Sequence, residues 1–293
     1  MRATAVSVIE RLETVIDIDA PPQRLRLVIE RELIAHFGQP AIQAAENAER
    51  LEVNVSRLIS EKCVKCEQDG MIPILTVIGS SFDSVAGSCH IRPTDSVDVA
   101  RAKAHRIQAE PLRARIQSLT FSEFELFGAK VLRLLGAQKT HVTPHSNDQG
   151  IDFYGVLNVG QLQNVPAPFF RLTHDVELRL AGQAKHYPTR SIGTSVVREL
   201  VGAVSLARHK TFSTDEDLFE ELELKPLNPL LVLLFTTGTL SSGAIDLASK
   251  LGIIARSGRQ LAAFLADCGI GMVSGGTGMV FDKTEFDAWL VAP

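Results

Sequence analysis

The stretch Val176-Glu177-Leu178-Arg179-Leu180-Ala181-Gly182-Gln183-Ala184-Lys185-His186-Tyr187 predicts a long strand in the second half of the sequence. Successive side chains of a strand point to opposite faces, so Gln183 and Lys185 share one face and His186 points to the other. A second short segment, Asp148-Gln149-Gly150-Ile151-Asp152, opens an earlier strand. A carboxylate from one strand can therefore meet an amide oxygen and an ammonium group from its neighbour.

Helix and strand patterns alternate regularly on both sides of this strand. The expected strands cover residues 140–143, 151–157, 176–187, 230–235 and 253–255, and the expected helices cover 122–135, 194–210, 242–251 and 258–266. Ser122 is expected to cap the first helix, and residues 158–174 are expected to form a loop. Three consecutive strands favour a meander, whereas a strand–helix–strand unit needs parallel pairing. We therefore predict an α/β fold with a mixed central sheet flanked by helices.

The first part of the chain has a different pattern. Residues 22–60 and 96–118 have helical spacing of apolar residues, and residues 72–78 resemble a strand. We predict a mainly helical N-terminal region over 1–119, for target recognition, oligomerisation or partner docking, followed by a catalytic domain over 120–293.

Charge and composition limit the function classes. The net charge is −4, and no apolar run reaches the ~18–20 residues that cross a bilayer. We expect a soluble, cytoplasmic protein without a membrane partner. An acidic total counts against avid non-specific DNA binding, but a local basic groove can lie within it. The stretch Arg101–Arg115 is a candidate for such a groove, and a solvated helix face is the alternative.

Asp152, Gln183 and Lys185 form a set suited to phosphodiester hydrolysis. Mg²⁺ prefers oxygen ligands, which the Asp152 carboxylate and the Gln183 amide can supply. Lys185 could position the attacking water, help deprotonate it, or stabilise charge on the phosphate. Because glutamine leaves the site one negative charge poorer than a carboxylate would, Glu125, on the preceding helix, is a candidate for a further acid.

These segments, with Leu134–Gly136, Val197–Leu200 and Thr236–Gly238, resemble the Mrr catalytic domain, the Gln-x-Lys variant of the PD-(D/E)xK restriction-endonuclease-like superfamily. The resemblance covers roughly residues 120–268. It implies a Mg²⁺-dependent DNA endonuclease, in which Mn²⁺ can substitute, with Asp152, Gln183 and Glu125 as metal ligands and Lys185 as a catalytic residue. It also implies restriction of foreign, including modified, DNA. Cutting both strands of a duplex needs two active sites, so we expect a homodimer or larger assembly.

Four further residues are candidates for DNA contacts: Gln149, Arg198, Thr237 and Ser241. Thr237 and Ser241 follow a buried strand and open a helix, where hydroxyls and free amides can bind a phosphate. Simple capping of that helix is the alternative. The glycine-rich stretch 269–278 has no phosphate-loop motif and indicates a turn, so we expect no ATP requirement.

The cysteines allow a zinc site or reduced, partly buried thiols. Cys63 and Cys66 form a Cys-x-x-Cys pair, and Cys89 is a candidate third ligand. The sequence offers weak candidates for the other two zinc ligands, because a second Cys-x-x-Cys pair is missing.

Two other functions remain open. An inactive or effector-gated sensor with a nuclease fold would fit the acidic total, and a structure-selective repair nuclease or resolvase could use the same catalytic residues.

Overall fold

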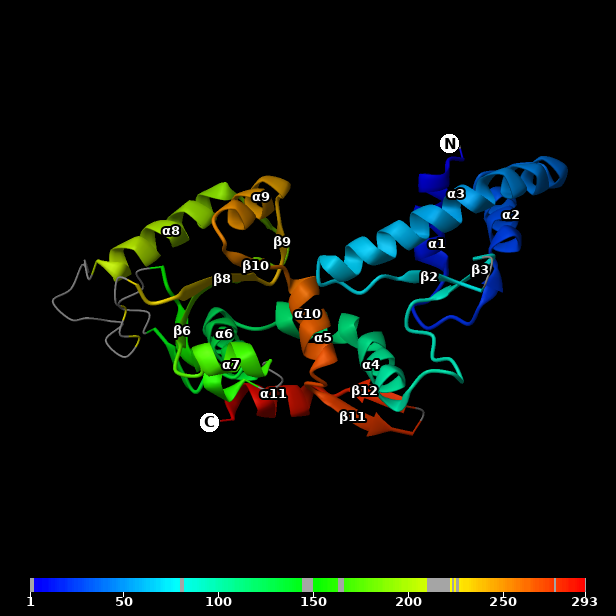
Figure 1. Ribbon diagram of the computed structural model, residues 1–293. Helices are drawn as coiled ribbons and strands as arrows, with labels where there is room; N and C mark the ends of the chain where they lie inside the picture. The colour runs from blue at the N-terminus through cyan, green and yellow to red at the C-terminus, as the bar shows by residue number, and fades with distance from the viewer. Residues whose placement is uncertain are drawn as a thin grey trace. The chain divides into compact units, whose positions relative to one another are not determined.

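Figure 1 shows a computed structural model of the chain. It describes residues 3–79, 82–143, 150–162, 166–209, 222, 224, 227–276 and 278–292. The chain divides into two compact units, the first containing residues 1–111 and 263–285 and the second containing 112–262 and 286–293. The predicted domain boundary after residue 119 remains a prediction, and residues 263–285 group with the first unit.

The first unit begins with three helices around one apolar core. They are α1 (Ala5–Val15), α2 (Leu25–Ala35) and α3 (Ala41–Gln68). Thr4 and Ser7 form a reciprocal capping box at the start of α1. Fully buried side chains at helical spacing, such as Leu25, Ile29 and Leu33, face the core.

A small sheet completes this core. Its strands are β1 (Gln23–Arg24), β2 (Leu75–Ile78) and β3 (Ser84–Gly87), in the order β1-β3-β2 with antiparallel pairing. The chain order is therefore helix, strand, two helices and a hairpin.

The rest of the first unit includes α4 (Val97–Ile107) and the hairpin of β11 (Met272–Gly275) and β12 (Gly278–Phe281). Arg106 on α4 forms an ion pair of 2.6 Å with Asp267. The glycine-rich stretch 269–278, which the sequence indicated as a turn, contains β11 and the first residue of β12. Three helices each contain a limit between the units: α5 (Ala109–Gln117), α10 (Gly258–Asp267) and α11 (Lys283–Val291).

The second unit is built on a five-stranded mixed sheet in the order β10-β8-β6-β5-β4. The strands are β4 (Lys139–Val142), β5 (Phe153–Asn158), β6 (Glu177–Lys185), β8 (Leu230–Thr236) and β10 (Ile254–Arg256). β4, β5 and β6 pair antiparallel, whereas β6, β8 and β10 pair parallel. The predicted mixed α/β sheet, with its meander and parallel crossovers, is confirmed.

Helices cover both faces of this sheet. On one face α6 (Phe121–Leu134) packs so closely that a Cβ at Gly128 would overlap the Phe153 ring. On the other face α8 (Thr194–Arg208) packs Ala203 and Ala207 against Ala181 of β6. α9 (Ser242–Lys250) lies beside α8 on that face, and α11 buries Phe286 and Leu290. A short parallel pair, β7 (Ser191–Ile192) and β9 (Thr239–Leu240), joins the loops after β6 and β8.

Two local predictions about this unit were wrong. Thr120, rather than Ser122, caps α6. Its hydroxyl accepts a hydrogen bond from the Glu123 amide, and the Thr120 amide donates one to the Glu123 carboxylate. The expected loop over 158–174 contains a 3-10 turn (Val159–Gln161) and α7 (Ala167–Thr173). Pro168 stands in the first turn of α7, where its fixed φ favours a helix start.

Within the described residues, none of the helices has the length and apolar character needed to cross a membrane.

Candidate active site

The site begins where β5 starts and β6 ends. The Asp152 amide donates to the Gly182 carbonyl at 2.9 Å, and Phe153 pairs with Gly182 in the antiparallel ladder. Asp152 therefore stands opposite Gln183. Residues directly opposite in such a pair project from the same face, with Cβ atoms about 5 Å apart. The predicted meeting of Asp152 with Gln183 thus follows from the register of these two strands.

Asp152 is buried and held in place by the backbone of the neighbouring strand. Only 5% of its surface is exposed, and its Oδ2 accepts the Ala184 amide at 2.6 Å. A charge-assisted hydrogen bond of this length fixes the orientation of the carboxylate. The Ala184 amide is a functional group that sequence reasoning missed, because a strand residue at the end of its ladder carries no special signature.

Gln183 is more deeply buried, with 2% of its surface exposed. Among the described residues its Oε1 has no hydrogen-bond partner. A buried amide oxygen without a partner costs free energy and is rare in native proteins. Gln183 therefore presents an acceptor that a cation could satisfy, on the same face as Asp152.

Gly150 shapes the space beside Gln183. Its φ of +85° lies in the left-handed region that glycine adopts most readily. A Cβ at this position would lie 3.0 Å from Ala203 Cβ and 3.6 Å from Gln183 Nε2. The glycine in the Gly-x-Asp segment thus allows both the turn and the close approach of α8.

Lys185 is the last residue of β6 and lies half-buried on the Gln183 face, beside Thr236 of β8. It forms no ion pair with any described carboxylate. Its ammonium group therefore belongs to the carboxyl end of β6, two residues after the buried Gln183.

Glu125 lies on α6 and is half-buried. Its helix neighbours Phe121 and Phe124 both contact the ring of His186, with centroids 5.1 and 6.3 Å apart. Because His186 directly follows Lys185 and points to the other face, the first turns of α6 lie at the carboxyl end of β6, on the face of the sheet opposite Gln183 and Lys185. The role of Glu125 as a metal ligand remains a prediction.

His186 faces away from the candidate site, as the alternation predicts. Its Nε2 lies 3.2 Å from the Gln117 carbonyl oxygen, and its ring packs on two phenylalanines. These contacts identify a packing role for His186.

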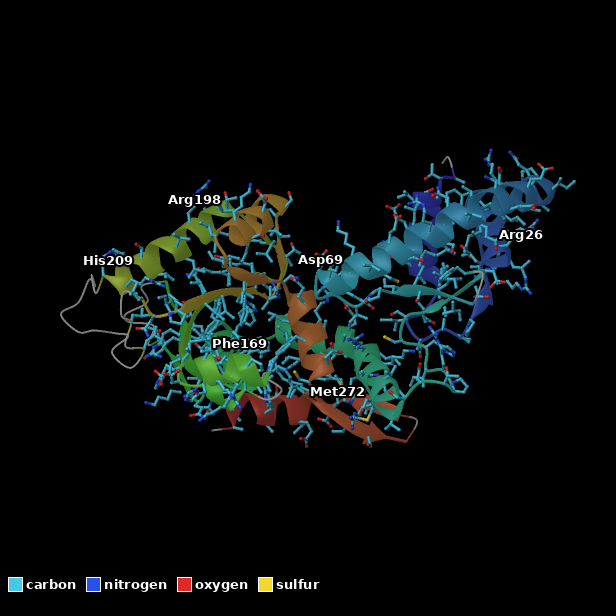
Figure 2. The ribbon with its side chains drawn as sticks, viewed as in Figure 1. Arg26, Asp69, Phe169, Arg198, His209 and Met272 are labelled. Atoms are coloured by element: carbon cyan, nitrogen blue, oxygen red, sulfur yellow. The ribbon has the colours of Figure 1, made fainter. Side chains whose placement is uncertain are left out.

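The candidate DNA contacts lie in different surroundings. Arg198 is exposed on α8, where Figure 2 labels it, and its Nη1 donates to Thr194 at 3.1 Å. Ser241 caps α9 by accepting the Ala244 amide. Thr237 is buried, and its Oγ1 has no hydrogen-bond partner among the described residues. Gln149 lies outside the described residues, so its predicted role is not tested.

The basic run Arg101–Arg115 is largely neutralised within the protein. Arg101 pairs with Asp98, Lys103 with Asp95, Arg106 with Asp267, and Arg115 with Asp287. A cation that is already paired with a carboxylate is less available to neutralise a DNA phosphate, so fewer counterions are released from the DNA on binding. The alternative interpretation of this run was a solvated helix face, and its cations instead pair with acids both near in the sequence (Asp95, Asp98) and far from it (Asp267, Asp287).

The cysteines form no zinc site in the described part of the chain. No three histidine, cysteine, aspartate or glutamate side chains gather there as metal ligands, so Cys63, Cys66 and Cys89 are not brought together. Cys63 Sγ donates to the Leu75 carbonyl, and burial, with Glu67 nearby, raises the pKa of this thiol to about 11. Burial also raises the pKa of Cys66 and Cys89. Cys63 and Cys66 are half-buried, and no third metal-ligating side chain joins them among the described residues.

We therefore expect protein purified without chelator to contain no stoichiometric zinc. The described residues offer Cys63 and Cys66 no third ligand, and a structural zinc ion needs four. Elemental analysis by mass spectrometry measures the zinc content directly, and one zinc per chain, lost together with Cys63→Ser, would contradict this expectation.

Comparisons with known proteins gave one family match and one structural match. Residues 116–218 match the Mrr_cat family model, described as a restriction endonuclease. The chain is also similar in structure to the MspJI restriction endonuclease in complex with a 27-mer oligonucleotide, with 18% identity and a TM-score of 0.38. That match covers 69% of this chain, which spans 39% of the length of the other. No curated protein matched. The segment that carries Glu125, Asp152, Gln183 and Lys185 is thus similar to the catalytic domain of restriction endonucleases.

Proposed function

We propose that this protein is a Mg²⁺-dependent DNA endonuclease that acts in restriction of foreign DNA. The observation that carries the proposal is the buried Gln183 Oε1, which has no hydrogen-bond partner among the described residues and shares a sheet face with Asp152 and Lys185. The match of residues 116–218 to a restriction endonuclease family model supports the same reaction.

The residues present fit a hard divalent cation. Asp152 and Gln183 offer oxygen donors, and Glu125 would add a second carboxylate. Mg²⁺ bound here would offset the charge that develops on the phosphate and orient a water molecule. The Ala184 amide holds the Asp152 carboxylate in orientation, so the site is organised by the strands themselves.

Lys185 has two roles open to it in this arrangement. Its ammonium group can donate to the scissile phosphate and stabilise the added negative charge, or it can orient the attacking water. Its position on the strand, two residues after Gln183, places both side chains along one face.

The first unit would supply recognition. Its helix, strand, two helices and hairpin follow the order of a winged helix-turn-helix domain, in which the second helix of the pair enters the major groove. A homodimer would provide the two active sites that cutting a duplex requires.

The direct test is incubation of the purified protein with methylated and unmethylated plasmid, in Mg²⁺ and in EDTA. We expect linear or fragmented DNA only with the metal, and Mn²⁺ in place of Mg²⁺ to support cleavage. A difference between the two plasmids would identify modification dependence. DNA binding without cleavage under every metal condition would favour a sensor, and selective cutting of branched DNA would favour a repair nuclease.

Glu125 gives a separate prediction about metal affinity. Replacing it with glutamine removes a negative charge near the ion, so more Mg²⁺ should be needed for half-maximal cleavage, by roughly tenfold. The measurement is a Mg²⁺ titration of the cleavage rate at saturating DNA. Glu123→Gln is the matched control, because Glu123 lies on the same helix and serves its cap. An unchanged titration for Glu125→Gln would remove this residue from the site.

A further inference from the structure

The loops that leave the carboxyl ends of β6, β8 and β10 are basic, in contrast to the chain as a whole. Residues 185–193, 236–241 and 256–260 contain the cations Lys185, Arg190, Arg256 and Arg259 and no aspartate or glutamate. The net charge of the whole chain is −4. Ligands of open α/β sheets bind at the carboxyl ends of parallel strands, so this concentration of charge lies where a ligand would approach.

Backbone contacts hold these loops together. Gly238 approaches the loop after β6 so closely that a Cβ would overlap the Tyr187 carbonyl oxygen and lie 2.7 Å from that of Arg190. The Gly258 amide donates to the Gly238 carbonyl at 3.1 Å, which joins the loop after β10 to the loop after β8. Figure 1 labels β9, β10 and α10, the elements that follow or flank these loops. The arginines are thus carried by one connected surface.

The three arginines are exposed and not neutralised by the protein. Arg190 lies over the Tyr187 ring at 5.4 Å, and Arg256 donates to the Ala255 carbonyl. None of Arg190, Arg256 and Arg259 forms an ion pair with a described carboxylate. Most of the cations in the Arg101–Arg115 run, by comparison, are paired with acids.

The dimensions suit a nucleic-acid backbone. Arg190 follows β6, and Arg256 and Arg259 stand at and after the end of β10, with β8 between these two strands. Neighbouring strands lie about 4.8 Å apart, so the ends of β6 and β10 are about 10 Å apart. One strand of B-DNA presents a phosphate for roughly every 3.4 Å of helix axis, or about three over this length. Lys185, at the end of β6, connects this surface to Asp152 and Gln183.

We infer that Arg190, Arg256 and Arg259 form a phosphate-binding strip that holds the DNA backbone next to the catalytic residues. The inference rests on the proposed function, since it names how the same site positions its substrate. The strip supplies affinity without sequence preference, because contacts to phosphates read no bases. It explains how an acidic chain can bind DNA through a local surface.

The test is the salt dependence of binding to a 30-base-pair duplex in EDTA, where cleavage cannot interfere. Each phosphate that the protein neutralises contributes about 0.9 to the slope of log affinity against log salt. The variant Arg190→Ala/Arg256→Ala/Arg259→Ala should therefore lower the magnitude of the slope by roughly two to three. It should do so equally for unrelated duplex sequences.

Two matched variants separate charge from damage to the fold. Arg133→Ala removes an exposed arginine that binds Thr140 in the same unit and should leave the slope unchanged. Arg190→Lys/Arg256→Lys/Arg259→Lys keeps the charges and should retain most of the slope. A triple alanine variant with the wild-type slope overturns the strip, and so does an equal reduction in Arg133→Ala.

The results of this experiment can reject the strip and the endonuclease proposal separately. If the wild-type protein binds with a slope that the triple variant lowers but cuts no DNA with Mg²⁺, the strip stands and the endonuclease proposal falls. If the triple variant keeps both the slope and full cleavage, the strip falls and the endonuclease proposal stands.

Discussion

Asp152→Asn and Lys185→Ala are each expected to reduce Mg²⁺-dependent DNA cleavage by at least about 10²-fold, the effect typical of removing one group that stabilises a transition state. Asp152→Asn keeps the volume and an acceptor oxygen for the Ala184 amide, so the reduction would reflect the missing charge. Lys185→Ala removes the ammonium group at the end of β6.

The measurement is single-turnover cleavage of plasmid DNA, with thermal unfolding of each variant as a check of the fold. Asp246→Asn and Lys250→Ala are matched controls, because these exposed residues of α9 form an ion pair with each other. Such surface pairs contribute only about 0–1 kcal/mol, so the controls should keep their activity. Wild-type cleavage by either site variant would disprove the assignment of that residue.

Gly128→Ala is expected to destabilise the second unit by about 1–3 kcal/mol, the usual cost of overpacking a core. A methyl group at residue 128 would overlap the Phe153 ring, and a Cβ at Gly182 would overlap the same ring. Phe153 is fully buried and stacks on Phe235 with centroids 5.4 Å apart. It therefore has little room to move.

Gly202→Ala is the matched control for this prediction. Gly202 also lies in a helix, but it is exposed and no atom lies within 4 Å of its added Cβ. Here alanine should stabilise the helix by about 0.4–1 kcal/mol, through helix propensity and lower entropy of the unfolded chain. Urea unfolding gives both values. If the two substitutions shift stability in the same direction, packing around Phe153 does not decide the effect.

The sheet could be predicted because its strands have strong local signals. β6 alternates, β8 is a run of apolar residues, and the helix between them forces parallel pairing. Details that depend on competition between similar residues could not be predicted. Thr120 and Ser122 are both good capping residues. Thr120 is favoured because its amide also donates a hydrogen bond to the Glu123 carboxylate.

The candidate site was predictable only in part. The face shared by Gln183 and Lys185 follows from alternation, but the burial of Gln183 and the bond from Ala184 to Asp152 depend on strand register. The pairing of Arg106 with Asp267 joins residues far apart in sequence, so a basic run looked available when it was not. The same non-locality hid Arg190, Arg256 and Arg259, whose loops meet only in the folded chain.

The connection between β5 and β6 leaves the sheet at Asn158 and returns at Glu177, the opposite end of these strands from Asp152 and Gln183. At about 3.3 Å per residue, roughly 20 Å of strand separates it from the chemistry. Phe169, which Figure 2 labels on α7 within this connection, and Leu172 of the same helix are exposed. Because of this position, the connection is a permissive site for engineering. A peptide tag or a fused reporter domain placed there would leave the strands that carry the catalytic residues undisturbed.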